Sequence, residues 1–303
     1  MSESLVAGVE LGGTKCVCIL AEGPDAVRDE VRIATTTPAE TFSAIGDVLA
    51  RWRGFRALGL ASFGPLDLDL GSPDHGRIVA TPKPGWSGAD LTTLARGLAV
   101  PTAIDTDVNG AAYAEGRWGA ARGLSSWAYI TIGTGIGVGA VVGGRSIAGL
   151  GHAEAGHLRV ARLAGDAFPG VCPYHGDCVE GLASGPAVAA RAGRAAETLS
   201  ADDPAWGPTI HALGGLLHNL VLTTAPQRIL IGGGLGGGQP ALLPRLRSAL
   251  LDSLGGYATA RRIADQIDAF IAPPALGARA GPLGSIALAL SALGRPVATS
   301  LGA

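Results

Sequence analysis

Two glycine turns, each placed between apolar segments, dominate the pattern of this 303-residue chain. The first turn is Leu11–Thr14 and the second is Gly133–Gly137, about 120 residues later. Their flanking segments are Val6–Glu10 and Lys15–Leu20 for the first, and Trp127–Ile132 and Val138–Val142 for the second. Apolar runs on both sides of a short turn predict β-hairpins. Because glycine has no Cβ, the N–H groups of such turns can approach a phosphate. The repeat predicts a duplicated architecture.

The remaining segments alternate between strand-like and helix-like patterns, which predicts α/β layers. Strands are expected at Ala57–Ser62, Thr102–Asp105, Arg228–Ile231 and Ala269–Ala272. Helices are expected at Thr41–Trp52, Val108–Trp118, Pro186–Leu199, Thr209–Thr224, Pro240–Leu254 and Leu283–Leu293. We expect a small N-terminal domain formed by residues 1–115 and 284–303. A larger domain, residues 116–283, would carry the loop-rich segment Gly151–Gly185.

Composition argues against two classes of partner. A net charge of −2 provides no basic face for nucleic acid and no polybasic stretch for anionic lipid. The first residues lack the pattern of a signal peptide, and no apolar run approaches the ~20 residues of a membrane span. Cys16 and Cys18 share one face of a strand and are expected to be small buried side chains. We therefore expect a cytoplasmic protein without nucleic-acid or membrane partners.

The glycine turns differ from the common dinucleotide and P-loop motifs. Both lie between two strands, and no G-x-x-x-x-G-K-[ST] motif occurs. A third cluster, Ile231–Gly237, matches G-x-G-x-x-G by letter, but no second strand ends in an acidic residue about 20 positions on. Two hairpins fit an actin-like nucleotide clamp, in which Gly233 and Gly234 would let adenosine pack on backbone. Glu10, just before the first turn, suits magnesium or a magnesium-bound water. Ordinary hairpin turns are the alternative.

A second candidate site follows the strand at Thr102–Asp105. Phosphoryl transfer requires a base that accepts the hydroxyl proton, and Asp107 lies where a buried strand gives way to a helix. The positive end of the helix dipole favours a carboxylate there. Asn109 can hold a sugar hydroxyl, while Asp105 would support the turn or a metal. The alternative role for Asp107 is a helix cap.

A third candidate site is a cluster of histidine and cysteine residues. His157, Cys172, His175 and Cys178 have the spacing H-x14-C-x2-H-x2-C. Two imidazoles and two thiolates form a ligand set that favours tetrahedral zinc. In a cytosolic loop this clustering favours a metal over a disulfide. With four protein ligands, the site would be structural.

In these motifs the chain resembles the ROK family of sugar kinases and repressors, and within it the bacterial fructokinases. The resemblance covers nearly the whole chain. The motifs, in order, are Glu10–Lys15, Ala61–Pro65, Thr81–Trp86, Asp105–Asn109, Gly133–Gly137, Glu154–His157 and Cys172–Glu180. It implies a two-domain actin-like ATPase (ribonuclease H-like) fold, ATP-dependent phosphorylation of a hexose, and a homodimer. D-fructose, converted to fructose 6-phosphate, is the expected acceptor.

The resemblance also implies roles for individual residues. Asp107 would be the general base, and magnesium would bind near Glu10. The sugar would contact Thr106, Asn109, Glu154, His157 and Glu180. ATP would contact Gly12, Gly13, Thr14, Lys15, Gly133, Thr134, Gly135, Gly233 and Gly234. His157 would bind zinc through one ring nitrogen and a sugar oxygen through the other.

Three positions depart from the family pattern. Many members have Asp at the position of Glu10, Asn at that of Thr106, and a third Cys at that of His175. The change at Thr106 removes a sugar-contacting amide, which favours fructose over glucose. Lys83 or Trp86 would shape the acceptor pocket, although a Pro/Gly turn with a buried Trp anchor explains the same motif.

Three other functions remain open. The first is a kinase for glucose, mannose or another hexose. The second is a sugar-responsive repressor, which requires a DNA-binding helix-turn-helix for which about nine residues before the first turn leave no room. The third is an actin-like ATPase with a structural or chaperone role, which the acceptor motif and the metal loop disfavour.

Overall fold

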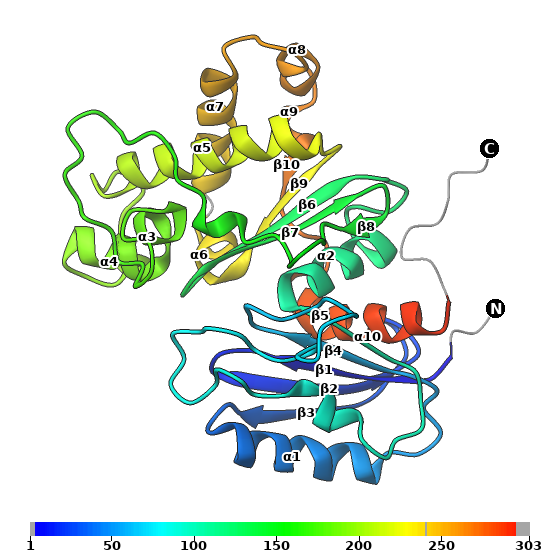
Figure 1. The fold of residues 1–303 in the computed structure, drawn as a ribbon. Helices are drawn as coiled ribbons and strands as arrows, with labels where there is room; N and C mark the ends of the chain where they lie inside the picture. The colour runs from blue at the N-terminus through cyan, green and yellow to red at the C-terminus, as the bar shows by residue number, and fades with distance from the viewer. Residues whose placement is uncertain (1–3, 240, 295–303) are drawn as a thin grey trace. The chain divides into compact units, whose positions relative to one another are not determined.

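The computed structural model describes residues 4–239 and 241–294 and divides into two compact units. The first unit comprises Met1–Ser125, Gly143–Ala153 and Ala278–Ala303, and the second comprises Ser126–Val142 and Glu154–Gly277. These bounds differ from the expected domains, because residues 116–125, 143–153 and 278–283 belong to the first unit. The secondary-structure elements are labelled in Figure 1.

The first unit is built on a sheet with the strand order β3-β2-β1-β4-β5. These strands are β1 (Val6–Leu11), β2 (Lys15–Ala21), β3 (Val27–Ala34), β4 (Leu58–Ser62) and β5 (Thr102–Thr106). The first three pair antiparallel, whereas β4 and β5 continue in parallel from β1. Parallel pairing requires crossovers, which α1 (Pro38–Arg51) and the 3₁₀ helix η1 (Leu91–Ala95) help to provide.

Helices cover both faces of this sheet (Figure 1). Ala7, Val9 and Leu11 of β1 pack in one core with Ile45 and other apolar residues of α1. The opposite face carries α10 (Ala280–Ala292), which also contacts α2 (Asp107–Trp118). A Cβ on Gly59 would lie only 1.9 Å from the Ser285 carbonyl oxygen, so glycine is what allows α10 to lie directly on the strands.

The second unit repeats this topology. Strands β6 (Trp127–Ile132) and β7 (Ile136–Val142) form an antiparallel hairpin, and β9 (Ile229–Gly232) and β10 (Ile271–Ala272) extend the sheet in parallel from β6. The order β7-β6-β9-β10 therefore matches β2-β1-β4-β5 of the first unit. The duplication predicted from the two glycine turns is confirmed.

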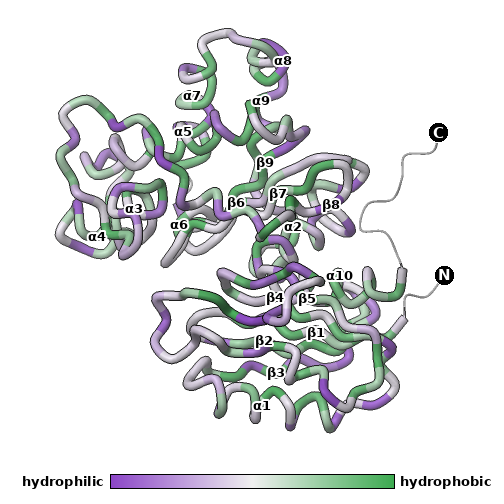
Figure 2. The backbone as a smooth tube through the Cα atoms, viewed as in Figure 1, coloured by the Kyte–Doolittle hydropathy of each residue, from purple (hydrophilic) through white to green (hydrophobic). Residues whose placement is uncertain are grey.

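Helices of the second unit enclose its own apolar core. The longest are α5 (Trp206–Thr224) and α7 (Leu242–Leu254), which pack together. The shorter helices are α3 (Val179–Ala183), α4 (Gly185–Ala192), α6 (Gly233–Gly238), α8 (Ala260–Ala264) and α9 (Ile267–Phe270), with 3₁₀ turns η2 (Ala155–His157), η3 (Ala196–Thr198) and η4 (Gly277–Arg279). Figure 2 shows the hydrophobic colouring of these helices and strands. No described helix has the length and apolar character needed to cross a bilayer.

Several elements differ from the sequence expectation. The predicted helix Pro186–Leu199 is two pieces, α4 and η3, because Gly193 takes a left-handed conformation that ends α4. The third glycine cluster lies between the strand expected at Arg228–Ile231 and the helix expected at Pro240–Leu254, and it forms the helix α6 itself. The strand expected at Ala269–Ala272 covers only β10, since α9 occupies Ile267–Phe270. Pro240, predicted to begin a helix, lies outside the described residues.

Candidate active site

The first glycine turn connects β1 and β2 and is held from outside the hairpin. Gly12 N donates to the Lys15 carbonyl at 3.0 Å, while the Thr35 hydroxyl donates to the Gly12 carbonyl at 2.8 Å. A Cβ on Gly12 would lie 2.7 Å from the Lys15 oxygen, so the turn itself requires glycine there. A Cβ on Gly13 would meet no atom within 4 Å. No neighbouring atom therefore demands glycine at position 13, and the backbone there has open space beside it.

Lys83 reaches this turn from a distant loop. Its ammonium donates to the Gly13 carbonyl at 2.6 Å, across 70 residues of sequence. Trp86 of the same loop is fully buried, and its indole N–H donates to the Thr36 carbonyl at 2.9 Å. Trp86 is therefore the buried anchor that the alternative explanation of this motif predicted. Lys83 contacts the first glycine turn.

The turn from β5 into α2 organises the proposed acceptor residues. Thr106 is the N-cap, and its hydroxyl accepts a hydrogen bond from Asn109 N at 3.2 Å. Asp107 is the first residue of the helix, and its Oδ1 accepts from Val108 N at 2.8 Å. The capping role considered for Asp107 thus falls to Thr106. Because Thr106 caps the helix, the carboxylate of Asp107 is not needed as the cap.

Asp105 is the buried hub of this turn. Its Oδ1 accepts from Thr106 N at 2.7 Å and from Asn109 Nδ2 at 2.7 Å, and its Oδ2 accepts from the Ser146 hydroxyl at 3.2 Å. Tyr113 hydrogen-bonds the same serine hydroxyl at 2.9 Å. Burial raises the pKa of Asp105 above its ordinary value. Because both carboxylate oxygens accept, the amide nitrogen of Asn109 must face Asp105, and that fixes which way Asn109 points its carbonyl.

Glu10 lies at the end of β1 on the face covered by α10. A Cβ on Gly281, at the start of α10, would lie 1.9 Å from Glu10 Oε1. Burial, followed by the negative charge of Asp107, raises the pKa of Glu10 to about 7, while Lys15 acts in the opposite direction. A carboxylate whose pKa is raised by a second carboxylate nearby provides, with it, a charge set suited to a divalent cation.

The second glycine turn is tied to α3 and α4. The Glu180 carboxylate accepts from Ile136 N at 3.0 Å, and Gly185 N donates to the Gly133 carbonyl at 2.7 Å. A Cβ on Gly135 would lie 2.7 Å from Glu180 Oε2, whereas a Cβ on Gly133 would meet nothing closer than 3.9 Å. Thr134 at the tip is exposed. Gly133, like Gly13, is a glycine that the fold does not require.

The third glycine cluster packs against the second turn. Gly233 has a φ of +85°, and a Cβ there would lie 2.5 Å from the Ile132 carbonyl oxygen. A Cβ on Gly234 would meet no atom within 4 Å, so the backbone there has open space beside it. The fold therefore requires glycine at position 233. At position 234 no neighbouring atom requires it, and the backbone is accessible.

His157 and Glu180 lie side by side, with His157 Nε2 4.0 Å from Glu180 Oε1. Glu154 immediately precedes η2, is exposed, and its carbonyl accepts from His157 N at 2.9 Å. Glu154 is thus joined to His157 by a backbone hydrogen bond, and His157 lies beside Glu180. All three residues belong to the second unit. The remaining predicted acceptor residues, Thr106, Asp107 and Asn109, form the turn of the first unit described above.

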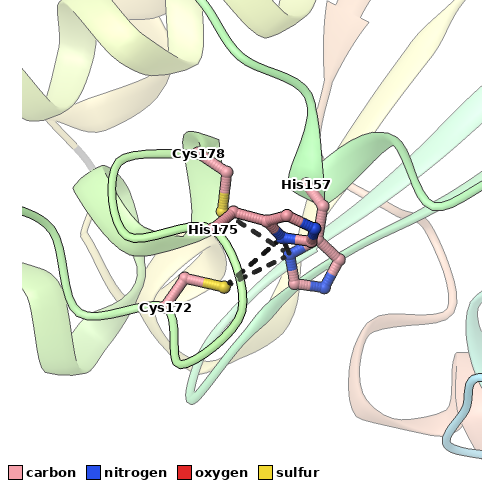
Figure 3. Close-up of side chains that lie close together, drawn as sticks. All are labelled: His157, Cys172, His175 and Cys178. Atoms are coloured by element: carbon pink, nitrogen blue, oxygen red, sulfur yellow. Dashed lines mark hydrogen bonds between the residues drawn. The ribbon is translucent and has the colours of Figure 1, made fainter. Parts of the chain in front are cut away.

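The four predicted metal ligands converge (Figure 3). His157 Nδ1 is 3.6 Å from Cys172 Sγ, 3.5 Å from Cys178 Sγ and 3.3 Å from His175 Nδ1. Cys172 Sγ is also 3.6 Å from His175 Nδ1. Zinc bound tetrahedrally, with bonds of about 2.3 Å to sulfur and about 2.0 Å to nitrogen, requires N–S edges of about 3.6 Å and N–N edges of about 3.3 Å. These four distances, two of them to His175, match those edges, and all four ligand atoms lie within 4.8 Å of one another.

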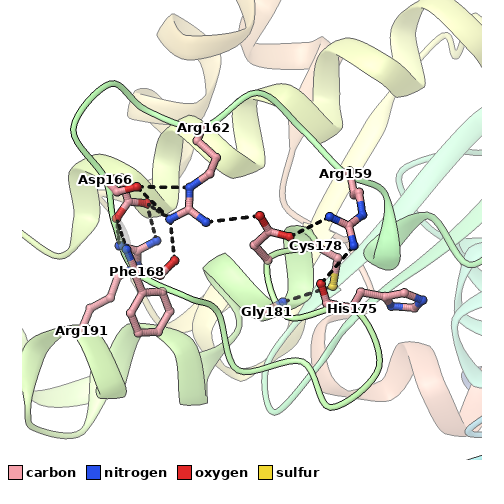
Figure 4. A network of polar contacts seen from close by, with 9 residues as sticks. Arg159, Arg162, Asp166, Phe168, His175, Cys178, Gly181 and Arg191 are labelled. Atoms are coloured by element: carbon pink, nitrogen blue, oxygen red, sulfur yellow. Dashed lines mark hydrogen bonds and ion pairs between the residues drawn. The ribbon is translucent and has the colours of Figure 1, made fainter.

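An ion-pair network anchors the loop that carries these ligands (Figure 4). Arg191 of α4 makes a bidentate pair with Asp166 at 2.7 and 2.8 Å, and both side chains are less than one-tenth exposed. Arg159 and Arg162 both pair with Asp177, which precedes Cys178. The hydrogen bonds from Arg191 lower the pKa of Asp166 to about 2. The stabilisation of the fold by the Arg191–Asp166 pair is therefore complete at a pH above the ordinary Asp pKa of about 4, and it is lost as the pH falls through about 2.

Sequence reasoning did not identify Thr35, Tyr113 and Ser146, which hold the first turn and Asp105. No local pattern marks them, because each acts across 19 or more residues of sequence, Thr35 from the end of β3 and Ser146 from the short strand β8 (Arg145–Ser146), which pairs with β7 in a hairpin. Thr35 follows β3, an edge strand that was not predicted. The one available signal was the apolar alternation of Val31 and Ile33 within that strand.

Comparisons with known proteins extend over nearly the whole chain. A family model described as the ROK family matches residues 6–292. A protein of Bacillus subtilis (strain 168) named putative fructokinase is 39% identical over 290 residues, covering 95% of this chain and 96% of that protein. The fructokinase of Pediococcus pentosaceus is also 39% identical over 290 residues, covering 95% and 99%.

A solved structure extends the comparison to the fold. The ROK hexokinase of Thermus thermophilus is similar with a TM-score of 0.71 and 27% identity, over 96% of this chain and 99% of that one. The two-domain α/β actin-like fold predicted from the sequence is confirmed.

Proposed function

Since the chain belongs to the ROK family, we propose that it is an ATP-dependent hexose kinase that converts D-fructose to fructose 6-phosphate. Relatives named fructokinase support this activity along almost their full length. The observation that carries the proposal is the Asp105–Asn109 turn, where Thr106 caps α2 and Asp107 occupies its first position. A turn built this way holds a carboxylate and an amide side by side for a hydroxylated substrate.

Asp107 accepts the proton of the attacking hydroxyl in this proposal. The hydroxyl oxygen bonds to the γ-phosphorus of ATP, the bond to the bridging oxygen breaks, and ADP leaves. Asn109 holds a neighbouring hydroxyl in the orientation imposed by its 2.7 Å bond to Asp105. Glu154, His157 and Glu180 bind further hydroxyl groups, and their short polar side chains suit that task.

ATP binding is assigned to the glycine turns. Gly12, Gly13, Thr14 and Lys15 supply N–H groups, a hydroxyl and a positive charge from the first turn. Gly133, Thr134 and Gly135 supply the second turn, and Gly233 and Gly234 receive the adenosine. Open space around Gly13, Gly133 and Gly234 supports this assignment. Glu10 would hold Mg²⁺, directly or through water, and the ion would neutralise phosphate charge.

Zinc is the metal proposed for His157, Cys172, His175 and Cys178, because the donor set and four of its donor–donor distances match tetrahedral N₂S₂ coordination. The bound ion would fix the loop and the ring of His157. His157 Nδ1 faces the sulfur atoms, which leaves Nε2 on the side of Glu180 for a sugar oxygen.

Fructose is proposed over glucose because of Thr106. Its hydroxyl is used to cap α2, so it does not extend an amide to the acceptor as Asn would. In this proposal Thr106 affects the sugar in two ways. Its side chain limits the space beside the sugar, and its hydroxyl holds the backbone N–H of Asn109.

A coupled assay of ADP release across fructose, glucose, mannose and other hexoses tests the proposal. Fructose should give the highest kcat/KM. A value for glucose tenfold above that for fructose would exclude fructose as the preferred substrate. Absence of activity with every hexose would exclude the kinase assignment itself.

The proposed setting of the enzyme is a homodimer in the cytoplasm that uses no nucleic-acid or membrane partner. The dimer follows from the family resemblance alone. Light scattering of the purified protein tests it, and a monomeric mass at micromolar concentration would contradict it.

A further inference from the structure

Lys83 makes an unusual contact for a loop lysine. Its ammonium donates to the main-chain carbonyl of Gly13, at the exposed tip of the first glycine turn, over 2.6 Å. An ammonium has three N–H donors, and for the other two the structure provides no hydrogen-bond partner among the described residues. The charge of Lys83 thus lies on the turn proposed to bind ATP phosphates, and it retains donors for a further ligand.

Both ends of this contact are fixed by neighbouring residues. Thr35 donates its hydroxyl to the Gly12 carbonyl at 2.8 Å and its N–H to the Thr14 carbonyl at 3.0 Å. The next residue, Thr36, accepts the indole N–H of Trp86, three residues after Lys83. Trp86 packs edge-on against Phe42 and Phe63 in the core. A single segment therefore positions both the turn and the lysine loop.

The chain's use of basic residues points the same way. Only two of its 23 basic residues are lysines, Lys15 and Lys83, and both are at this turn. Among the residues the structure describes, ion pairs with Asp and Glu are formed by arginine, as in Arg28–Glu22 and Arg191–Asp166, and none by lysine. Arginine suits planar carboxylate pairing, whereas an ammonium is a compact charge that suits a phosphate.

We propose that Lys83 binds the phosphoryl group that is transferred. The inference rests on the proposed kinase activity. In the nucleotide-free chain the ammonium binds Gly13, and in the complex its remaining N–H groups bind oxygens of the γ-phosphate. As negative charge moves to the bridging oxygen during transfer, a fixed ammonium beside the turn stabilises it.

Kinetics of Lys83→Met test this role, because methionine keeps an unbranched stem and removes the charge. We expect kcat to fall about 100-fold, the size of effect seen when one fixed donor is removed from a site of developing charge. KM for fructose should stay within about threefold. Arg77→Met is the matched control: Arg77 lies in the same long segment, pairs with Asp74 near the surface, and should leave kcat unchanged.

A purely structural Lys83 would behave differently. Loss of a tie between two loops would lower the melting temperature and raise KM, with kcat within about threefold of the wild type. That result would overturn the proposal.

Lysine labelling gives a second test that needs no sugar. Pyridoxal 5′-phosphate forms an imine with an accessible lysine amine, with loss of water, and borohydride reduces the imine to a stable adduct. Peptide mapping is simple because the chain offers only Lys15, Lys83 and the α-amino group. We expect labelling at Lys83 in the free protein and strong protection by ATP with Mg²⁺.

The labelling outcomes separate the two proposals. Two results would overturn the role of Lys83 at the phosphate. In one, Lys15 is labelled and Lys83 is not; in the other, Lys83 is labelled equally with and without ATP. A wild-type protein that phosphorylates no hexose but shows ATP protection at Lys83 would retain the phosphate site and exclude the hexose kinase.

Discussion

Neighbouring side chains at the start of α2 have separate tasks. Thr106 caps the helix, Asp105 orients Asn109 through a 2.7 Å bond, and Asp107 at the first helical position is the carboxylate proposed to act on the substrate. Because Thr106 provides the cap, a substitution of Asp107 should leave the turn folded. The sequence pattern allowed Asp107 to be either the base or the helix cap, whereas the structure gives the cap to Thr106.

Asp107→Asn tests the base directly. We expect kcat to fall by at least about 10²–10⁴-fold, because an amide cannot accept the hydroxyl proton. Sugar binding should weaken by no more than about tenfold, since Asn retains one acceptor oxygen, and the melting temperature should change little, since the cap is Thr106. Steady-state kinetics and calorimetry measure both. If more than about a tenth of kcat remains, Asp107 is not the base, and Asp105 becomes the next candidate.

Glu10→Gln should separate stability from function. Because the fold raises the pKa of Glu10 from 4.5 to about 7, ionised Glu10 destabilises the metal-free protein. The variant should be equally stable at pH 4, then gain about 1.4 kcal/mol per pH unit up to pH 7, reaching up to about 3 kcal/mol at pH 8. Denaturant unfolding in EDTA measures this gain. Activity with Mg²⁺ and ATP should fall. Equal stability at pH 8 would contradict the raised pKa.

Gly133→Val and Gly135→Val should have different effects. A side chain on Gly133 enters open space, so this variant should weaken ATP binding and spare the sugar. A side chain on Gly135 meets Glu180, which the fold uses to hold Ile136 N, so this variant should weaken the binding of both substrates. Calorimetry with each ligand distinguishes them. Unchanged ATP affinity in Gly133→Val would argue against the second phosphate turn.

The sequence could reveal site residues whose chemistry is local. The spacing of His157, Cys172, His175 and Cys178 predicted a cluster that the fold brings together. It could not reveal Thr35 or Ser146, because their hydroxyls act only once β3 and the Ser146 hairpin are in place. The same limit hid the contact of Lys83, whose motif suggested the sugar pocket.

At the level of elements, the loop that carries the four proposed zinc ligands has two independent anchors. The four ligands form one, and the Arg191–Asp166 pair with its neighbours forms the other. We expect Cys178→Ser to abolish binding of one zinc per chain and to expose amides of the loop, while α5 keeps its protection from hydrogen exchange. Structural zinc contributes folding free energy, so the melting temperature should also fall.

Elemental analysis and hydrogen exchange measure these effects. Ser248→Ala, on the exposed side of α7, is the control and should retain zinc. Freshly purified wild-type protein without any transition metal would contradict the assignment.

Elements with strong apolar patterns were predictable, and elements shaped by tertiary contacts were not. The β1–β2 and β6–β7 hairpins follow from apolar runs around glycine turns. Helix α6 could not be expected, because glycine disfavours helix by about 1 kcal/mol per residue; in the fold, α6 packs against β6 and β9. Strand β3 was missed because most of its residues are exposed and it lies at the edge of its sheet.

For the whole molecule, the repeat of one strand order in both units is the main organising fact. Each unit has a hairpin whose first strand continues in parallel into two further strands, and each hairpin turn contains a glycine open to a ligand. The glycine turns alone predicted this duplication. The bounds of the units could not be predicted, because residues 143–153 join the first unit through contacts such as Ser146–Asp105.

Gly59→Val tests how the first unit is closed. Its Cβ would lie 1.9 Å from the Ser285 carbonyl, so the variant should displace α10 and cost about 3 kcal/mol or more. Gly46→Ala in α1 is the control, since a Cβ there meets nothing and alanine favours helix. Denaturant unfolding should show a destabilised first unit and a stable control. Equal stability of Gly59→Val would mean that α10 does not rest on β4.

The position of α10 has a consequence for the order of synthesis. The sheet of the first unit is complete once Thr106 has been made, yet the helix that covers one of its faces is made only after the whole second unit. Throughout translation of the second unit, a nascent chain must carry a sheet that α1 covers on one face and that is uncovered on the other. Ribosome stalling or premature termination before residue 280 would therefore yield a product prone to aggregation, even though every proposed site residue had already been synthesised.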